Sequence, residues 1–188
     1  MKEWYTVSEV AHILNVTEET VNRWIEEYKI ISDLDEEGVC TIEHEDLVLF
    51  LQANRIPVEI LAHASSGTKR VLIVDDEPDV LDVLEEGIAR EDGLHAEGVS
   101  TAFEAGVFLR RYRPHAVVLD ISLTDIDGRR VCEIFKADDE LSHVKIIGIS
   151  GKISQYEEKD IHSHGFDAYL RKPFDMKILA NTIKNILC

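Results

Sequence analysis

Apolar runs alternate with amphipathic stretches over the C-terminal two-thirds of the chain. Four apolar runs stand out, at residues 71–74, 116–119, 144–149 and 168–170, and the first three are rich in Val, Ile and Leu. A weaker run covers residues 94–99. Stretches with helical spacing follow several runs, at residues 80–88, 131–135 and 178–187, and a polar helical stretch follows residue 149. Strands that are apolar at nearly every position are typical of parallel sheets with helices on both faces. We therefore predict five βα units and, with right-handed crossovers, a doubly wound, five-stranded parallel sheet.

The first 64 residues show a different pattern, in which short helices follow one another. Thr6 and Thr17 each precede apolar residues at helical spacing, and a threonine in this position caps a helix. The intervening Asn15 and Val16 predict a tight turn, and two short helices joined in this way form a helix-turn-helix. A further helix is predicted over residues 45–51, after an irregular, acid-rich stretch.

Residues 62–69 are the weakest stretch for regular structure, because they are mostly small and polar. A chain of 188 residues is long enough for two compact units. We therefore predict a small, mainly helical domain over residues 1–61, a linker over residues 62–69 and an α/β domain over residues 70–188.

Charged and polar side chains follow the predicted strands at their carboxyl ends. The first strand is followed by Asp75 and Asp76, the third ends in Asp120, the fourth in Ser150, and Lys172 follows the fifth. The carboxyl ends of parallel strands share one edge of the sheet, so these side chains converge. Three carboxylates without a cation would repel one another, whereas Mg²⁺ binds carboxylates together with water and phosphate oxygens. The sequence predicts a magnesium site that handles phosphate.

Five motifs in this order resemble the receiver domain of two-component response regulators. They are VLIVDDEP at residues 71–78, VLDISL at 118–123, DG at 127–128, ISG at 149–151 and DAYLRKPF at 167–174. The resemblance covers essentially all of residues 70–188 and implies a flavodoxin-like fold. It also implies a phosphoacceptor protein that catalyses its own phosphotransfer and dephosphorylation, without an independent enzyme domain.

The resemblance implies a role for each acidic residue of the site. Asp120 would accept the phosphoryl group from a phosphohistidine, carried by a sensor histidine kinase. Asp76 and Asp120 would bind Mg²⁺ together with the backbone carbonyl of Ser122, and Asp75 would orient water molecules on the metal. Such a transfer depends on positioning and electrostatics, since the metal and a lysine stabilise the charge of the phosphoryl group during its transfer.

The resemblance also implies how phosphorylation changes the surface of the domain. Lys172 would pair with the phosphoryl oxygens, and the Ser150 hydroxyl would donate a hydrogen bond to one of them. The movement of Ser150 would leave space for the Tyr169 ring to turn, so a change of charge becomes a change of surface. We expect phosphorylation to promote a homodimer through the face formed by the fourth helix, the fifth strand and the fifth helix.

Residues 4–54 resemble the winged helix-turn-helix domain of the MerR and excisionase families. The resemblance rests on TVNRWI at residues 20–25, Ile42, and EDL and FL within residues 45–51. These families bind DNA, which makes Asn22, Arg23 and Lys29 the candidate DNA contacts. The first functional hypothesis is therefore a transcription factor that phosphorylation switches.

The charge of the chain opposes this hypothesis. The sequence has 20 Lys and Arg against 37 Asp and Glu, a net charge of −17, and residues 1–64 have four against fourteen, a net charge of −10. Glu18 and Glu19 start the second helix, and four acids lie within residues 33–37, where a DNA-binding domain needs bases for the phosphates. The second hypothesis is a signalling adaptor whose acidic N-terminal domain binds a protein.

Other features restrict the location and the chemistry of the chain. No apolar run reaches about 18 residues, and the N-terminus lacks the apolar stretch of a signal peptide, so we expect a cytoplasmic protein without membrane contact. Cys40, Cys132 and Cys188 lie far apart without metal-binding spacing. We interpret them as free thiols.

Overall fold

The computed structural model describes residues 3–35, 38–61, 67–151 and 161–187. These residues form two compact units, each with its own hydrophobic core: the first contains the residues up to Gly67 together with Arg111–Arg113, and the second contains the other residues from Thr68 on. Most of the predicted linker, residues 62–66, lies outside the described residues, so the domain bounds stay a prediction. No helix in the described ranges has the length and apolar character needed to cross a membrane.

The N-terminal unit contains two capped helices joined by a tight turn. Its elements are β1 (Trp4–Thr6), α1 (Val7–Leu14), α2 (Glu18–Glu26), β2 (Asp33–Leu34), β3 (Cys40–Glu43) and α3 (His44–Ala53). Thr6 caps α1 in a capping box with Glu9, and the Thr17 side chain accepts a hydrogen bond from the Thr20 amide at the start of α2. Asn15 ends α1 with a φ of 49°, in the left-handed region. The predicted helix-turn-helix is confirmed.

The acid-rich stretch that we treated as irregular contains a short β-hairpin. β2 and β3 pair antiparallel, and β3 also pairs with β1, so the sheet order is β1-β3-β2. The Asp35 side chain accepts a hydrogen bond from the Val39 amide across the turn at 2.8 Å. This hairpin corresponds to the wing that the winged helix-turn-helix resemblance implies, and its mainly polar residues leave no alternating apolar pattern.

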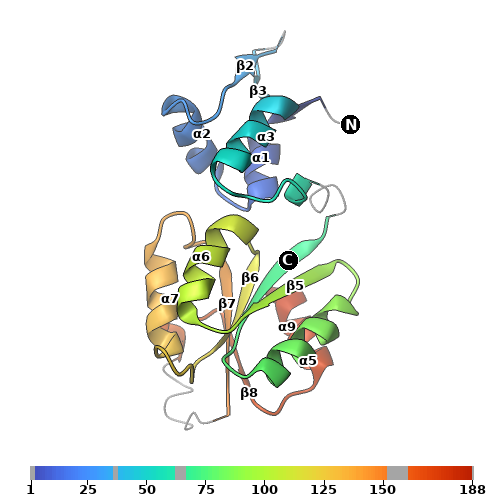
Figure 1. Cartoon of the computed structure of the whole chain (residues 1–188), viewed down its shortest axis with the longest axis vertical. Helices are drawn as coiled ribbons and strands as arrows, with labels where there is room; N and C mark the ends of the chain where they lie inside the picture. Colours follow the sequence, from blue (N-terminus) through green and yellow to red (C-terminus); the bar gives the residue numbers. More distant parts are fainter. Residues whose placement is uncertain (1–2, 36–37, 62–66, 152–160, 188) are drawn as a thin grey trace. The chain divides into compact units, whose positions relative to one another are not determined.

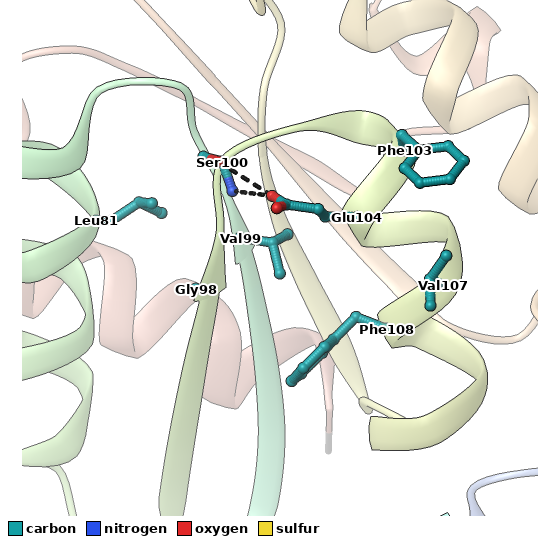
Figure 2. Close-up of a pocket in the computed structure, with 8 residues that line it drawn as sticks. All are labelled: Leu81, Gly98, Val99, Ser100, Phe103, Glu104, Val107 and Phe108. Atoms are coloured by element: carbon teal, nitrogen blue, oxygen red, sulfur yellow. Dashed lines mark hydrogen bonds between the residues drawn. The ribbon is translucent and has the colours of Figure 1, made fainter. Parts of the chain in front are cut away.

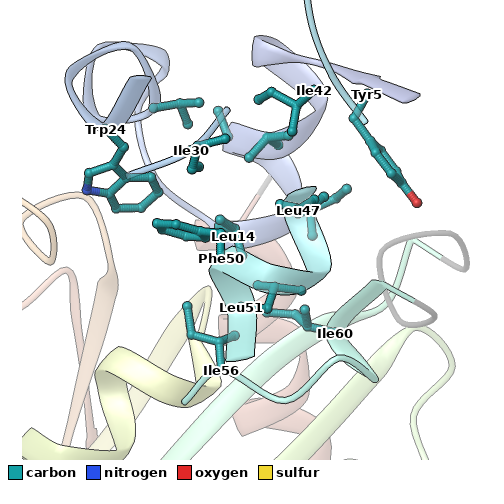
Figure 3. Packing of buried hydrophobic residues seen from close by; sticks show 14 residues of the cluster. Tyr5, Leu14, Trp24, Ile30, Ile42, Leu47, Phe50, Leu51, Ile56 and Ile60 are labelled. Atoms are coloured by element: carbon teal, nitrogen blue, oxygen red, sulfur yellow. The ribbon is translucent and has the colours of Figure 1, made fainter. Parts of the chain in front are cut away.

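The core of the N-terminal unit lies between its three helices and the sheet (Figure 3). The Trp24 and Phe50 rings pack at 4.9 Å between centroids, which joins α2 to α3. Ile56 and Ile60 are also buried in this core. The hydrophobic core therefore extends beyond the last predicted helix to the residues just before the predicted linker.

The C-terminal unit alternates strands and helices as predicted. Its elements are β4 (Lys69–Val74), α5 (Pro78–Ala89), β5 (Leu94–Val99), α6 (Ala102–Tyr112), β6 (Ala116–Asp120), α7 (Gly128–Ala137), β7 (Lys145–Ser150), the short 3₁₀-helix η1 (Ile161–His164), β8 (Ala168–Arg171) and α9 (Met176–Ile186). The polar helix that we predicted after residue 149 falls largely on residues 152–160, which lie outside the described residues.

The five strands form one parallel sheet in the order β5-β4-β6-β7-β8. Figure 1 shows α5 and α9 on one face of this sheet and α6 and α7 on the other. β6 is buried at every position, as a strand covered on both faces requires. Strand order reverses at β4, so the carboxyl ends of β4 and β6 form the crevice where such sheets bind ligands. The predicted fold class is confirmed.

Candidate functional site

The carboxyl ends of four strands bring the predicted site residues to one edge of the sheet. Asp75 and Asp76 directly follow β4, Asp120 is the last residue of β6, Ser150 is the last residue of β7, and Lys172 directly follows β8. The parallel pairing of these strands fixes the position of each residue relative to the others.

The three carboxylates and the lysine are close together and mostly buried. One oxygen from each of Asp75, Asp76 and Asp120 lies within 4.8 Å of the others. Asp75 is completely buried and Asp120 is 4% exposed, whereas Asp76 lies at the rim and is half-buried. The Lys172 Nζ donates hydrogen bonds to Asp75 Oδ2 and Asp120 Oδ2, both at 2.7 Å.

The electrostatics of this cluster favour a bound cation. Burial raises the pKa of Asp75 above its usual value, although the Lys172 ammonium and the Glu77 amide oppose this. Burial would lower the pKa of Lys172, but its hydrogen bonds with Asp120 and Asp75 outweigh burial, and the pKa is raised. One ammonium faces three acids, so the oxygen cluster fits a hard divalent cation such as Mg²⁺.

Backbone amides hold two of the carboxylates in place. The Ser122 amide donates to Asp120 Oδ1 at 2.7 Å, and the Thr124 amide donates to Asp76 Oδ2 at 3.1 Å. Both donors belong to the loop that follows β6. Sequence reasoning missed them, because every residue except proline has such an amide and residue types give no signal for it.

Gly128 allows the loop after Asp120 to close over the strand end. A Cβ atom at Gly128 would contact the Asp120 carbonyl oxygen and would lie 2.7 Å from the Ile121 Cα. Real Cβ atoms do not approach backbone atoms so closely, so only glycine fits. The Asp-Gly motif in the sequence is the signal for this close approach.

The two predicted switch residues are connected at the end of β7. The hydroxyl groups of Ser150 and Ser122 are 3.0 Å apart, and the Tyr169 hydroxyl donates to the Ser150 carbonyl at 3.2 Å. The Lys172 amide also donates to the Ser150 carbonyl, at 3.0 Å, and the Lys172–Pro173 peptide bond is cis. β7, β8 and the lysine are therefore connected through one carbonyl group.

The candidate DNA contacts do not form a basic patch. Asn22 and Arg23 are exposed on α2, whose first turn carries two glutamates. Lys29 lies just after α2, and its ammonium forms an ion pair with the Glu27 carboxylate at 2.6 Å. The surface that would face phosphates thus combines few bases with several acids.

Comparison with known families covers both units of the chain. The family model of the response regulator receiver domain matches residues 71–184. A model of a helix-turn-helix domain matches residues 4–55. The two matched ranges contain all the candidate site residues of both units.

Similar proteins and structures agree with these matches. The polar-differentiation response regulator DivK of Brucella anthropi is 29% identical over 119 residues, 63% of this chain and 96% of DivK. A CheY-like receiver domain protein from Methanospirillum hungatei is 29% identical with a TM-score of 0.58, covering 64% of this chain and 94% of that one. A putative response regulator from Chloroflexus aurantiacus is 26% identical with a TM-score of 0.58, covering 64% and 98%. The chain belongs to the response regulator receiver-domain family, and it carries a helix-turn-helix domain before the receiver.

Proposed function

We propose that this response regulator accepts a phosphoryl group on Asp120 from a phosphohistidine of a sensor histidine kinase and thereby controls its helix-turn-helix domain. The observation that carries the proposal is the position of Asp120 at the end of β6, where Lys172 and two further carboxylates surround it. A carboxylate in this setting has both the cation and the metal ligands that phosphoryl transfer needs.

The residues of the site fit Mg²⁺ as the cofactor. Asp76 and Asp120 would bind the ion together with the Ser122 backbone carbonyl, and buried Asp75 would orient its water ligands. When bound, Mg²⁺ supplies positive charge against the oxygens of the transferring group. Asp76 must release the Thr124 amide from Oδ2, or bind the ion with its other oxygen, before it can act as a ligand.

The transfer forms one bond and breaks another. A carboxylate oxygen of Asp120 bonds to phosphorus as the bond between phosphorus and the donor imidazole nitrogen breaks, and the imidazole keeps the electron pair. Lys172 already contacts Asp120 Oδ2, so its ammonium moves only a short way to the new phosphoryl oxygens. The Ser122 amide holds Asp120 Oδ1 and fixes the orientation of the carboxylate during the reaction.

The signal leaves the site through Ser150. Its hydroxyl exchanges the Ser122 hydroxyl for a phosphoryl oxygen, which displaces the end of β7. Tyr169 follows because its own hydroxyl is bonded to the Ser150 carbonyl. We expect this movement to promote a homodimer through a face that includes β8 and α9; the predicted fourth helix of this face falls largely on residues 152–160, outside the described residues.

The output of the N-terminal domain is transcription regulation through DNA or, as a second candidate, binding of a protein partner. The acidic first turn of α2 and the ion pair of Lys29 with Glu27 favour the second candidate, because DNA affinity depends on free bases near the phosphates. A cytoplasmic location goes with both.

Phosphorylation of the full chain tests the first part of the proposal. A small phosphodonor such as acetyl phosphate with Mg²⁺ is expected to label the wild-type chain, and removal of Mg²⁺ with a chelator should stop labelling. The Asp120→Asn variant should take up no label, whereas Asp127→Asn, a matched change in the following loop, should be labelled normally. Equal labelling of Asp120→Asn and the wild type would refute the assignment.

A DNA-binding screen of the full chain, with and without a phosphoryl mimic, tests the output. Retention on duplex DNA that falls with added salt supports direct transcription regulation. No retention in either state, at low salt, assigns the domain to a protein partner.

A further inference from the structure

The three-stranded sheet of the N-terminal unit has one face in the core and one face open to solvent. Side chains alternate between the two faces along a strand, and directly paired residues share a face. Tyr5 and Ile42 are paired and buried, and Figure 3 shows both among the core side chains. Trp4 and Glu43 form the neighbouring pair, so they lie on the other face, where Trp4 is 51% exposed. The sheet therefore presents a tryptophan and an acid side by side to solvent.

This open face is hollowed. The pair of Thr41 with Asp33 continues the same face onto β2, because Thr41 lies two residues before Glu43 on β3. These side chains line a hollow together with Trp4, Glu3 and the start of α3. Among the described residues, no lysine or arginine lines it. The hollow is thus an acidic surface with an aromatic side chain in its wall.

The carboxylates of the hollow are not used within the described fold. The side chains of Glu3, Asp33 and Glu43 form no ion pair and no hydrogen bond with any described residue, and Glu43 precedes α3 without capping it. The hollow of the receiver in Figure 2 shows the contrast. Its one acid, Glu104, accepts hydrogen bonds from the Ser100 amide at 3.1 Å and from the Ser100 hydroxyl at 3.0 Å. The negative charge of the N-terminal hollow is available to a partner.

The arrangement of these acids excludes a small cation and fits a broad one. Within the described residues, only the receiver cluster of Asp75, Asp76 and Asp120 brings three metal-binding side chains within 4.8 Å of one another. The acids of the hollow are therefore too far apart to bind one metal ion together. A guanidinium group is planar, stacks on an aromatic ring and pairs with a carboxylate through two hydrogen bonds.

Trp4 and Glu43 offer both interactions to one guanidinium group. Directly paired residues have Cβ atoms about 4.5 to 5.5 Å apart, so one group can contact the ring and the carboxylate together. DNA presents phosphates on its surface and brings no cation to this hollow. The complementary charge is that of a basic protein segment.

We propose that this hollow docks an arginine side chain of a protein partner, with the guanidinium group stacked on Trp4 and paired with Glu43. Glu3 and Asp33, at the sides of the hollow, attract further basic side chains of the same segment. The proposal rests on the second candidate for the output, in which the N-terminal domain binds a protein, and it names the surface and the chemistry of that partner.

An NMR titration of the full chain with a capped peptide of sequence RGRGR tests the proposal. The chain has two tryptophans, Trp4 in the hollow and Trp24 in the core, where it is 4% exposed. The indole N–H signal of Trp4 should shift with added peptide, whereas that of Trp24 should stay in place. The peptide KGKGK should bind more weakly, because an ammonium group cannot stack and pair as a guanidinium group does.

Calorimetric titration of variants with RGRGR separates the hollow from general attraction to an acidic protein. Trp4→Ala should weaken binding roughly fivefold, and Trp4→Tyr should restore part of the affinity because it keeps an aromatic face. Glu3→Gln combined with Glu43→Gln should also weaken binding roughly fivefold. The matched control combines Glu19→Gln with Glu59→Gln, which removes the same charge from exposed positions outside the hollow, and it should change the affinity less than about twofold.

Several outcomes would overturn the proposal. They are a Trp4 signal that does not move, equal losses in the two charge variants, and equal affinity for RGRGR and KGKGK. A chain that is retained on DNA and does not bind the peptide refutes the protein-partner candidate together with the hollow, whereas a chain that binds neither refutes the hollow alone. Asp120→Asn should bind the peptide like the wild type, which separates this test from the proposed phosphorylation.

Discussion

Asp167 connects three elements of the receiver, and its replacement by asparagine should destabilise the domain in a pH-dependent way. Its Oδ2 accepts hydrogen bonds from the Lys136 ammonium at the end of α7 and the Ile146 amide in β7, both at 2.9 Å. Its Oδ1 contacts the Lys145 ammonium at 3.1 Å. Asp167 directly precedes β8, the strand that leads to Lys172, so this clamp also helps to position the site.

The size of the effect follows from how exposed each contact is. Asparagine can still accept the hydrogen bond from the Ile146 amide, so only the charge interactions are lost. The pair with Lys136 is partly buried, and a hydrogen bond between charged groups in such a place contributes about 1.5 to 3 kcal/mol. Lys145 is more exposed, and its pair adds less than about 1 kcal/mol. We expect Asp167→Asn to lower the free energy of unfolding by about 2 to 3 kcal/mol, or roughly 10 °C in the unfolding midpoint.

The pH dependence has a definite sign. Burial raises the pKa of Asp167, but hydrogen bonds from the Ile146 amide, Lys136 and Lys145 outweigh burial, and the pKa lies below its usual value. The unfolded chain therefore binds the proton first as the pH falls, and the stabilisation is complete above about pH 5 and lost through the lowered folded pKa. The difference between the wild type and Asp167→Asn should shrink as the pH decreases.

Urea unfolding of the two proteins between pH 7 and pH 3 measures this difference. Asp139→Asn is the control, because Asp139 is exposed and the substitution removes the same charge. A difference that stays constant with pH, or a control that loses as much stability as Asp167→Asn, would show that the clamp does not act through its charge.

Three further changes test the site and the N-terminal domain. Addition of Mg²⁺ should raise the unfolding midpoint of the receiver, because the ion binds only the folded state. Asp76→Ala should reduce this shift more than Asp75→Ala, because we assign the direct metal contact to Asp76. Equal shifts in both variants would contradict the assignment. Gly128→Ala should lower the free energy of unfolding by about 2 to 4 kcal/mol, because the added Cβ would clash with fixed backbone atoms. Gly106→Ala should raise it by up to about 1 kcal/mol, because its Cβ would enter open space, and calorimetry measures both changes. In a filter-binding assay, the full chain should bind random duplex DNA weakly and with a shallow salt dependence, and Glu18→Lys should strengthen binding regardless of DNA sequence. Tight binding with a steep salt dependence would show that net charge does not predict DNA binding by this protein.

The parallel sheet could be predicted because its strands are buried on both faces and leave continuous apolar runs. The run at residues 71–74 became β4 with two more residues at its start, and the weaker run at residues 94–99 became β5 with the same bounds. The position of Asp120 followed directly, because it is the last residue of such a run. The positions of charged residues at strand ends are thus the feature of the site that the sequence predicts best.

Contacts made by loop backbone, or by charged side chains away from the strand ends, could not be predicted. The Thr124 amide that binds Asp76 depends on the path of a loop, and a loop path leaves no pattern of residue types. The Lys136 ammonium donates hydrogen bonds to the Val144 carbonyl and to Asp167, which lies 31 residues further on, and no apolar pattern in the sequence indicates these contacts. The family resemblance implied a wing, but the apolar pattern did not show its strands, because the pairing of β2 with β3 involves only two residues on each strand.

The N-terminal domain shows that a fold and its usual task can be separated by charge. The core that specifies the helix-turn-helix, including Trp24 and Phe50, is independent of the exposed residues, so selection can change the surface without loss of the fold. The exposed positions of α2 and the wing carry acids such as Glu19 and Asp33, which oppose the approach of DNA. Association of two chains would bring two such acidic domains together and double the opposing charge as well as the few bases. A dimer therefore restores DNA binding only if its geometry places the basic side chains against the phosphates and directs the acidic ones toward solvent. Without that geometry, the same acidic surface favours a protein partner that carries positive charge.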